Sequence, residues 1–346
     1  MKLYRHWVAE TREIAGTTFH LRDGSNVSPE DAAAKLERRA AILRASEGRD
    51  LSEKESAAVR EALLDLGGRT PEGEYEAAIC EEVLDKPDAR NAVTRNRYGA
   101  EVLNSEDTCF LDVDRVQKAR TLGTRLVRFA APAAIVLAAG LIVAFAANAH
   151  LASGLHRVNT SSGLLLATVL IVLSILAVAG FAYALTSPVF ERPDRAEATL
   201  LAKVRALAEK PAWRGLAARV YKTAAGFRIL AQADGLAPGN ARFRALARAL
   251  DADRLYVNLC GKQGCWRARL TPKPRRAGVK RPPRETRFPR APEAEAPFAA
   301  WLAGYDAASA GFAVCRPVAT VGRIVETSAV RLHDDRTRCA SSLPLA

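Results

Sequence analysis

Two long hydrophobic runs without a charged residue dominate the pattern of the chain. The first covers residues 129–149 and the second covers residues 164–185. A helix rises 1.5 Å per residue, so a run of about 20 residues crosses the roughly 30 Å hydrocarbon core of a bilayer. The pattern therefore predicts a transmembrane helical hairpin over residues 128–186. A core hairpin buried inside a soluble domain is the alternative.

The charges beside the two runs predict the orientation of this hairpin. The connector, residues 150–163, carries one fixed charge, Arg157, whereas Lys and Arg are frequent on the outer side of both runs. These flanking residues are Arg115, Lys118, Arg120, Arg125 and Arg128 before the hairpin and Arg192, Arg195, Lys203 and Arg205 after it. Cytoplasmic segments collect Lys and Arg, so we expect both termini in the cytoplasm and the protein in the inner (plasma) membrane of a bacterium.

Shorter patterns predict a mixed fold in the N-terminal piece, residues 1–127. Ser28 followed by Pro29 is typical of a helix start, and Ser52 with Glu55 forms the pattern of a capping box for a second helix that ends near Gly67. After residue 87 the pattern changes to β-branched and aromatic residues, which favour short antiparallel strands. These strand candidates are residues 91–104 and 107–114.

The C-terminal piece, residues 187–346, continues the mixture. Its pattern predicts a helix from about Asp194, a β-hairpin around Ala224–Ala225–Gly226 and a helix over residues 238–250. Further strand candidates are residues 265–274, 312–322 and 328–335. We therefore expect an α+β fold in which helices pack on an antiparallel sheet of palm or RRM-like type, interrupted by the transmembrane hairpin. The two pieces are expected to share one sheet, with separate domains as the alternative.

Composition and charge narrow the class of protein. The chain of 346 residues has 51 Lys and Arg against 38 Asp and Glu, a net charge of +13. Such an excess favours a polyanionic partner, namely nucleic acid, nucleotide phosphates or an anionic membrane surface, although an Arg-rich bacterial composition gives the same excess. The six cysteines are scattered and the charged N-terminus lacks the apolar core of a secretory signal, so we expect a reducing compartment.

The charge is concentrated in a basic, Pro-rich loop over residues 267–292. Residues 267–290 contain ten Lys or Arg, five Pro and one Glu. This composition predicts a solvated arm or long loop. Such an arm suits anionic lipid or a phosphate backbone, and it also suits a linker without a partner.

Asp112 and Asp114 form the clearest candidate for chemistry. Residues two apart on a strand project to the same face, so the two carboxylates lie close together. Mg²⁺ or Mn²⁺ bound by such a pair supports nucleotidyl or phosphoryl transfer. The plain alternative is a strand that ends with two solvated aspartates. A zinc site at Cys260 and Cys265 lacks a second close pair of ligands.

Three motifs resemble those of an uncharacterised bacterial protein family. They are T-R-N-R-Y-G with F-L-D-V-D, then R-V-Y-K-T-A-A-G-F-R-I-L, and finally R-A-R-L-T-P-K-P, in this order along the chain. The resemblance implies no activity, because the family is uncharacterised.

A more remote resemblance is to the palm of archaeo-eukaryotic primase-type nucleotidyltransferases. It implies that Asp112 and Asp114 hold the metal and are catalytic. It also implies that phosphates meet Arg228, Arg267, Arg269 and Lys273. Arg228 stands where these enzymes carry a His, and the third carboxylate falls on Asp334 or Asp253.

The leading hypothesis is thus a membrane-anchored protein whose cytoplasmic domain binds nucleotide or nucleic acid phosphates through Mg²⁺ or Mn²⁺, with catalysis left open. The rival is a non-enzymatic membrane-tethered scaffold whose basic arm contacts anionic lipid or a partner. The chain contains no phosphate-binding P-loop, dinucleotide-binding glycine motif, nucleophile elbow or zinc-protease motif.

Overall fold

The computed structural model describes residues 1–14, 17–45, 78–114, 116 and 192–346. The predicted membrane hairpin and the helix predicted between Ser52 and Gly67 lie outside these residues. In the described ranges, no helix combines the length and apolar character that a membrane crossing needs.

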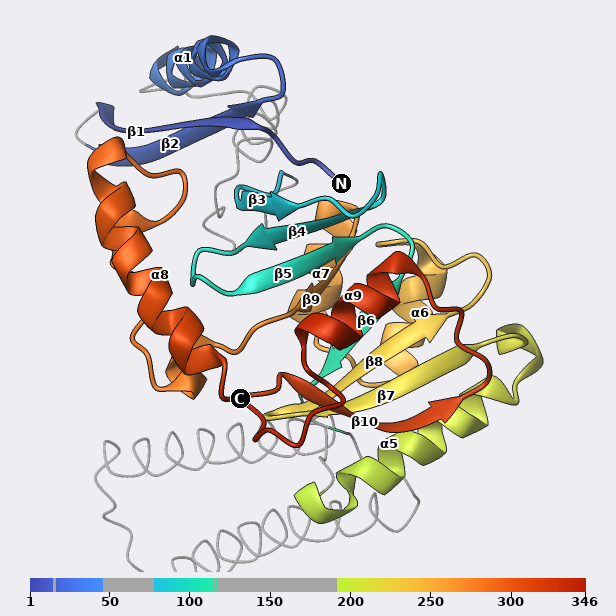
Figure 1. The fold of residues 1–346 in the computed structure, drawn as a ribbon. Coiled ribbons are helices and arrows are strands. Elements are labelled where there is room, and N and C mark those ends of the chain that lie inside the picture. The colour runs from blue at the N-terminus through green and yellow to red at the C-terminus, as the bar shows by residue number, and fades with distance from the viewer. Residues whose placement is uncertain (15–16, 46–77, 115, 117–191) are drawn as a thin grey trace, which may run out of the picture. The chain divides into compact units, whose positions relative to one another are not determined.

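The described residues form an α+β fold with antiparallel sheets, as the sequence predicts (Figure 1). Within them there are six α-helices and ten strands, arranged in one two-stranded and two four-stranded sheets. The described residues of the ranges 1–116 and 196–346 belong to one compact unit. Strands from both sides of the predicted hairpin meet in each four-stranded sheet.

The first four-stranded sheet has the order β10-β7-β8-β6. Its strands are β6 (Cys109–Val113), β7 (Ala217–Thr223), β8 (Gly226–Gln232) and β10 (Cys315–Val321). β7 and β8 form the β-hairpin that the sequence predicts, and its turn has two residues because Thr223 pairs with Gly226. A Cβ atom on Gly226 would lie 2.3 Å from the backbone oxygen of Val113, which explains why a glycine begins β8 beside the end of β6.

The second four-stranded sheet has the order β3-β4-β5-β9. Its strands are β3 (Glu82–Asp85), β4 (Asn91–Arg95), β5 (Glu101–Ser105) and β9 (Trp266–Arg269). The N-terminal and C-terminal pieces pair with each other, as predicted, but they do so in two sheets and not in one, because consecutive strands β5 and β6 enter different sheets. Both are buried on both faces and show no alternation of polar and apolar residues, so their pattern does not specify a common sheet.

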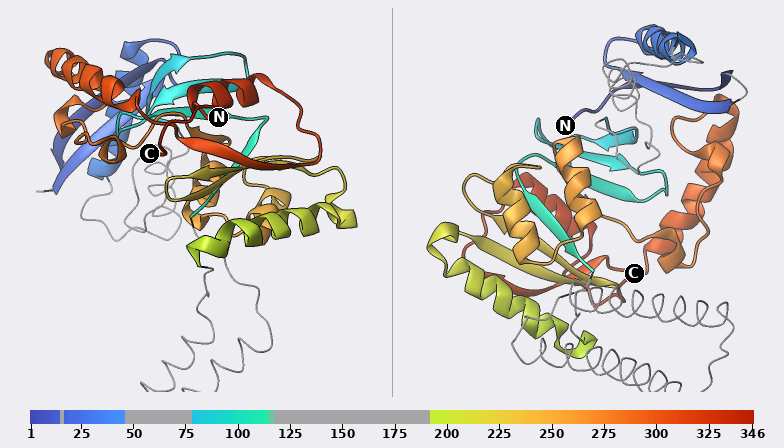
Figure 2. Two further views of the ribbon diagram at one scale, coloured as in Figure 1. Left: turned by 60° about the horizontal axis from the view of Figure 1, so that its bottom comes forward. Right: turned by 180° about the vertical axis from the view of Figure 1, so that it is seen from behind.

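Helices cover both faces of the first sheet. The helix α5 (Pro193–Ala208) packs on one face through Leu200, Val204 and Leu207, and α9 (Ser328–Arg336) lies on the opposite face (Figures 1 and 2). The remaining helices of this part are α6 (Ala241–Ala249), α7 (Arg254–Gln263) and α8 (Glu295–Ser309). The sequence predicts α5 and α6 but neither α7 nor α8.

The helix α9 corrects the strand predicted over residues 328–335. Thr327 caps the helix, since its side chain accepts a hydrogen bond from the Val330 amide at 3.2 Å. The buried residues Ala329, Val330 and His333 follow a helical spacing. Apolar and polar residues alternate in part of this stretch, which is typical of a strand. The helical spacing of the buried residues and the Thr327 cap stabilise a helix instead.

The N-terminal residues form a two-stranded sheet covered by one helix, with a hydrophobic cluster of its own. The strands β1 (His6–Ile14) and β2 (Thr17–Ser25) pair antiparallel, and α1 (Pro29–Ala45) packs on them through Leu36 and Ala40. Ser28 caps α1 as predicted, because its hydroxyl accepts the Asp31 amide at 3.2 Å.

The basic Pro-rich segment of residues 267–292 is a long loop, one of the two predicted forms, and it is folded onto the protein instead of extending as a free arm. It begins in β9 and continues through three short 3₁₀ helices, Pro274–Ala277, Arg284–Thr286 and Pro292–Ala294. Pro274, Ala277 and Thr286 are buried. Proline side chains bury apolar surface and fix the backbone, so a segment rich in charge still folds onto the protein.

Candidate anion-binding site

The register of the first sheet places three polar side chains in a row. Asp112 on β6 stands opposite Arg228 on β8, and Arg228 stands opposite Tyr221 on β7. Side chains opposite each other in an antiparallel sheet share a face, so all three project toward α9. The Nε of Arg228 donates to Oδ1 of Asp112 at 2.9 Å.

Arg228 is a buried hub of this row, with 1% of its surface exposed. Its Nη1 donates to the backbone oxygen of Arg269 at 2.8 Å, which ties β8 to the end of β9 in the other sheet. The same Nη1 lies 3.3 Å from Nε2 of His333 on α9. Arg228 therefore connects the two sheets and the covering helix.

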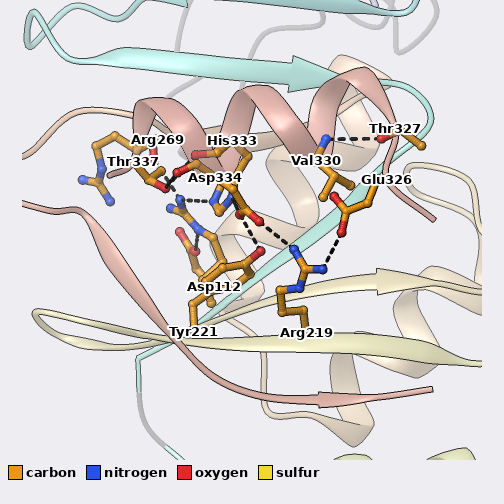
Figure 3. A network of polar contacts seen from close by, with 11 residues as sticks. Asp112, Arg219, Tyr221, Arg269, Glu326, Thr327, Val330, His333, Asp334 and Thr337 are labelled. Atoms are coloured by element: carbon orange, nitrogen blue, oxygen red, sulfur yellow. Dashed lines mark hydrogen bonds and ion pairs between the residues drawn. The ribbon is translucent and has the colours of Figure 1, made fainter. Parts of the chain in front are cut away.

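The contact with Arg228 fixes the state of His333. A guanidinium only donates hydrogen bonds, so Nε2 of His333 must accept, and the ring proton sits on Nδ1. Nδ1 then donates to Oδ1 of Asp334 at 2.8 Å (Figure 3). Burial lowers the pKa of His333 despite the opposing hydrogen bond to Asp334, so the imidazole is neutral.

Asp334 closes the network on the far side of His333. It accepts from the Tyr221 hydroxyl at 2.6 Å and from Nη1 of Arg219 at 2.6 Å (Figure 3). Burial alone would raise the pKa of Asp334, but the hydrogen bonds of His333 and Tyr221 lower it overall. Asp334 thus anchors α9 to the sheet, and Arg228 and His333 separate it from Asp112.

Asp253, the other candidate for a third carboxylate, is the cap of a helix. Its side chain accepts the Leu255 amide at 2.9 Å at the start of α7. Its own amide donates to the backbone oxygen of Asp112 at 2.9 Å, which places α7 next to the end of β6.

The structure brings most of the predicted site residues to one small cavity. Asp112, Asp114, Arg228, Arg269 and Lys273 all line it, together with Arg276. Arg267 is the exception and lines neither this cavity nor its larger neighbour. Its guanidinium binds Glu81 at 2.5 Å and Gln263 at 2.8 Å, which commits it to an internal ion pair.

The two aspartates have different environments. Burial raises the pKa of Asp112, but the charge and hydrogen bond of Arg228 outweigh it and lower the pKa overall. Asp114 is exposed and has a raised pKa because of partial burial and the repulsion of Asp253 and Asp112. Asp112 is therefore an ionised partner of Arg228, whereas Asp114 has no cation in hydrogen-bond contact within the described residues.

These surroundings fit a divalent cation poorly. Asp112 is already paired, and four basic side chains line the same cavity as the two carboxylates. Mg²⁺ prefers carboxylate, water and phosphate oxygens without competing cations. Across the described ranges no group of three or more His, Cys, Asp or Glu side chains is placed to hold a metal, which applies equally to Cys260 and Cys265. A metal at Asp112 and Asp114 stays a prediction.

A larger cavity of about 610 Å³ adjoins the small one. Both cavities share Arg269, Lys273 and Arg276. The complete lining of the larger one is Asn96, Tyr98, Ala100, Arg269, Lys273, Pro274, Arg275, Arg276 and Arg281. Five of these side chains are basic and none of the described lining residues is acidic.

The motif R-L-T-P-K-P builds the wall of this cavity. The Leu270 amide donates to the Glu101 backbone oxygen at 2.8 Å, and the Glu101 amide donates to the Thr271 hydroxyl at 2.9 Å. Behind the wall the Tyr305 hydroxyl on α8 donates to the Pro272 backbone oxygen at 2.7 Å. These contacts hold Lys273 and the following 3₁₀ helix at the end of β9.

The basic side chains of the cavity repel one another. Burial lowers the pKa of Arg269 to about 10, and the charges of Arg228 and Arg276 act in the same direction against the attraction of Asp112. The pKa of Lys273 is lowered by Arg269 first and then by burial. Within the described residues the Arg269 guanidinium makes no hydrogen bond or ion pair. The cavity therefore favours a multiply charged anion.

Sequence reasoning missed part of this site. Tyr98 and Asn96 belong to T-R-N-R-Y-G, and Arg275, Arg276 and Arg281 belong to the basic loop. Both motifs can be recognised in the sequence. Only the pairing of β5 with β9 shows that the two motifs lie next to each other in the structure. His333 and Tyr221 gave no signal, because their roles depend on α9.

No family model, no curated protein and no solved structure matches the chain.

Proposed function

We propose that the larger cavity, here called the basic cavity, binds the phosphate groups of a nucleotide or a nucleic acid. One observation carries this proposal: five basic side chains converge on a concave surface without an acidic neighbour in its described lining. A guanidinium group can donate two parallel hydrogen bonds to two oxygens of one phosphate. A polyanion also stabilises a partly dehydrated cluster of cations by neutralising their charge. The volume of about 610 Å³ lies within the range of ordinary small-molecule sites.

Metal-assisted nucleotidyl transfer on a palm-like domain remains a narrower proposal. Asp112 and Asp114 line the cavity next to the basic one, as such a reaction requires. The ion pair between Asp112 and Arg228 weighs against a metal there. The cations can bind phosphate without the carboxylates. We therefore propose phosphate binding as the function, and catalysis stays a prediction.

The proposed setting is the inner membrane of a bacterium, with the hairpin of residues 128–186 in the lipid bilayer and both termini in the cytoplasm. The rival function, a non-enzymatic scaffold whose basic loop contacts anionic lipid, rests on the exposed residues Lys280 and Arg284. The fold of the loop favours the nucleotide proposal, because Arg269, Lys273 and Arg276 line a cavity instead of a flat surface.

The experiment is a calorimetric titration of the full chain, purified in a nonionic detergent. ATP and inorganic tripolyphosphate are titrated in turn, each with EDTA and with Mg²⁺. The test variant is Arg269→Gln/Lys273→Gln. The matched control is Arg244→Gln/Arg248→Gln, which removes the same charge from exposed positions on α6.

We expect the wild type to bind ATP in EDTA and the control to match it. Losing charged hydrogen bonds worth about 1.5–3 kcal/mol each weakens binding by at least about tenfold in the test variant. Equal affinities of test and control variants contradict the proposal. The rival function, a scaffold whose basic loop contacts anionic lipid, predicts that ATP does not bind. It also predicts that Lys280 is protected from acylation in nanodiscs of phosphatidylserine and is not protected in nanodiscs of neutral lipid.

A further inference from the structure

The end of the basic cavity away from the aspartates is formed by the turn between β4 and β5. Oδ1 of Asn96 accepts the amides of Tyr98 at 2.9 Å and of Ala100 at 3.2 Å. Backbone amides only donate, so the side-chain oxygen faces the turn and the Nδ2 group faces away from it. No acceptor for this Nδ2 group occurs among the described residues, and Asn96 lines the cavity.

The Tyr98 ring contacts two guanidinium groups at the same end. The guanidinium carbon of Arg281 lies 4.8 Å from the centre of the Tyr98 ring, and that of Arg97 lies 4.9 Å away. Nη2 of Arg97 also donates to the Tyr98 hydroxyl at 2.7 Å. Aromatic rings and guanidinium planes are the surfaces on which proteins stack nucleobases.

Trp301 on α8 fixes this end of the cavity. Its Nε1 donates to the backbone oxygen of Lys280 at 2.9 Å, directly before Arg281. Its ring also covers Gly99, which has a φ of 88° and where a Cβ atom would lie 2.1 Å from the indole. The turn that carries Tyr98 and the segment that carries Arg281 are therefore held by the same side chain.

We infer that the ligand is a nucleoside polyphosphate whose base binds at Asn96, Tyr98 and Arg281. The base stacks on Tyr98 and Arg281, and the Nδ2 group of Asn96 donates to an acceptor on the base edge. The phosphates lie at the other end, against Arg269, Lys273 and Arg276, which point the terminal phosphate toward Asp114. This inference rests on the proposed function and adds that the site recognises the base as well as the charge.

The test compares ligands with and without a base on the full detergent-purified chain in EDTA. The probes are ATP, GTP, CTP, UTP and inorganic tripolyphosphate. The test variant is Tyr98→Leu, and the matched control is Tyr98→Phe, which keeps the ring and loses only the hydroxyl. Thermal unfolding of both variants monitors the fold.

We expect at least one nucleoside triphosphate to bind more tightly than tripolyphosphate. Tyr98→Leu removes a stacking contribution of about 1–3 kcal/mol, so it weakens the binding of that nucleotide by about 5- to 150-fold. Tripolyphosphate binding stays within about twofold in both variants, as does nucleotide binding in Tyr98→Phe.

The outcomes separate the two proposals. If tripolyphosphate binds as tightly as every nucleotide, or if Tyr98→Leu leaves nucleotide binding unchanged, the base site is refuted and phosphate binding stands. An equal loss of tripolyphosphate binding in Tyr98→Leu also refutes the base site, because the variant then disturbs the whole cavity. If neither class of probe binds the wild type, both proposals fail.

Discussion

Asp112 and Asp114 stand two residues apart on one strand but have opposite roles in the structure. Asp112 neutralises Arg228, a guanidinium that is buried among β8, β9 and α9. The pKa of Asp114 is raised, because partial burial and the charges of Asp253 and Asp112 oppose its ionisation more than Lys273 and Arg269 favour it. A buried ion pair contributes little when intact, but removing one partner leaves the other charge uncompensated.

Neutralising the two aspartates separately therefore has unequal effects on stability. Asp112→Asn lowers the free energy of unfolding by about 2 kcal/mol, less than the 3–5 kcal/mol of a fully buried pair. The smaller value reflects the 28% exposure of the Asp112 side chain. Asp114→Asn leaves the stability unchanged or raises it. Thermal unfolding with and without Mg²⁺ measures both; equal destabilisation by the two substitutions would contradict the different roles.

His333 makes the fold sensitive to mild acid. Its pKa is lowered in the folded state by burial, so below the ordinary value of about 6.5 the unfolded chain binds more protons than the folded one. Stability is therefore complete above about pH 6.5 and falls as the pH drops toward the folded pKa. The lowered pKa values of Asp112 and Asp334 act in the same direction only below about pH 4.

The pH dependence is tested by comparing the wild type with His333→Asn, whose amide can still donate to Asp334. The wild-type unfolding temperature should drop between about pH 7 and pH 5, and His333→Asn should show a smaller drop. The chain has five histidines, so the difference between the two proteins is the informative quantity. Identical pH profiles would show that His333 is not the responsible group.

At the scale of elements, the sequence predicts the cap of α1 and the turn between β7 and β8, but it does not predict α7, α8, α9 or the pairing of distant strands. Ser28 begins α1, and Ala224–Ala225 forms the turn between β7 and β8, because capping and turn geometry depend on neighbours in sequence. The assignment of β5 and β6 to different sheets and the register that pairs Asp112 with Arg228 depend on distant residues. The sequence therefore predicts most of the residues of the site. It does not predict which of them form ion pairs with each other.

A single side chain, that of Thr327, caps the N-terminus of α9. The Thr327 hydroxyl accepts the Val330 amide and lies 3.0 Å from the Thr108 hydroxyl. Thr327→Ala removes both contacts and should cost about 1–2 kcal/mol of stability. Thr327→Ser keeps the hydroxyl and should cost much less. Thermal unfolding compares them, and an equal loss in Ser and Ala variants would exclude capping as the cause.

At the scale of the whole molecule, the chain carries a net charge of +13, and five of its basic side chains line the basic cavity. The basic loop folds against β9 and α8, and Lys273, Arg275, Arg276 and Arg281 line one cavity, in which Lys273, Arg275 and Arg281 are exposed. Cationic walls attract a polyanion from a distance and hold it through direct contacts, and salt screens the first effect more than the second.

Ligand binding should consequently depend on salt. The screening length falls from about 10 Å to about 3 Å between 0.1 and 1 M NaCl, and ATP binding should weaken by roughly tenfold or more over that range. Arg269→Gln/Lys273→Gln should show a shallower dependence than Arg244→Gln/Arg248→Gln. Calorimetry at several NaCl concentrations measures both slopes, and parallel slopes would place the ligand elsewhere on the protein.

The most direct test of the central claim is to locate the bound nucleotide. The full chain in detergent is photolabelled with an azido analogue of ATP and digested, and the modified peptides are identified by mass spectrometry. The account predicts labels within residues 96–100 or 274–281 that excess ATP or tripolyphosphate removes. Labels confined to other segments, or labels in these segments that neither competitor reduces, would contradict the claim that the basic cavity is the nucleotide site.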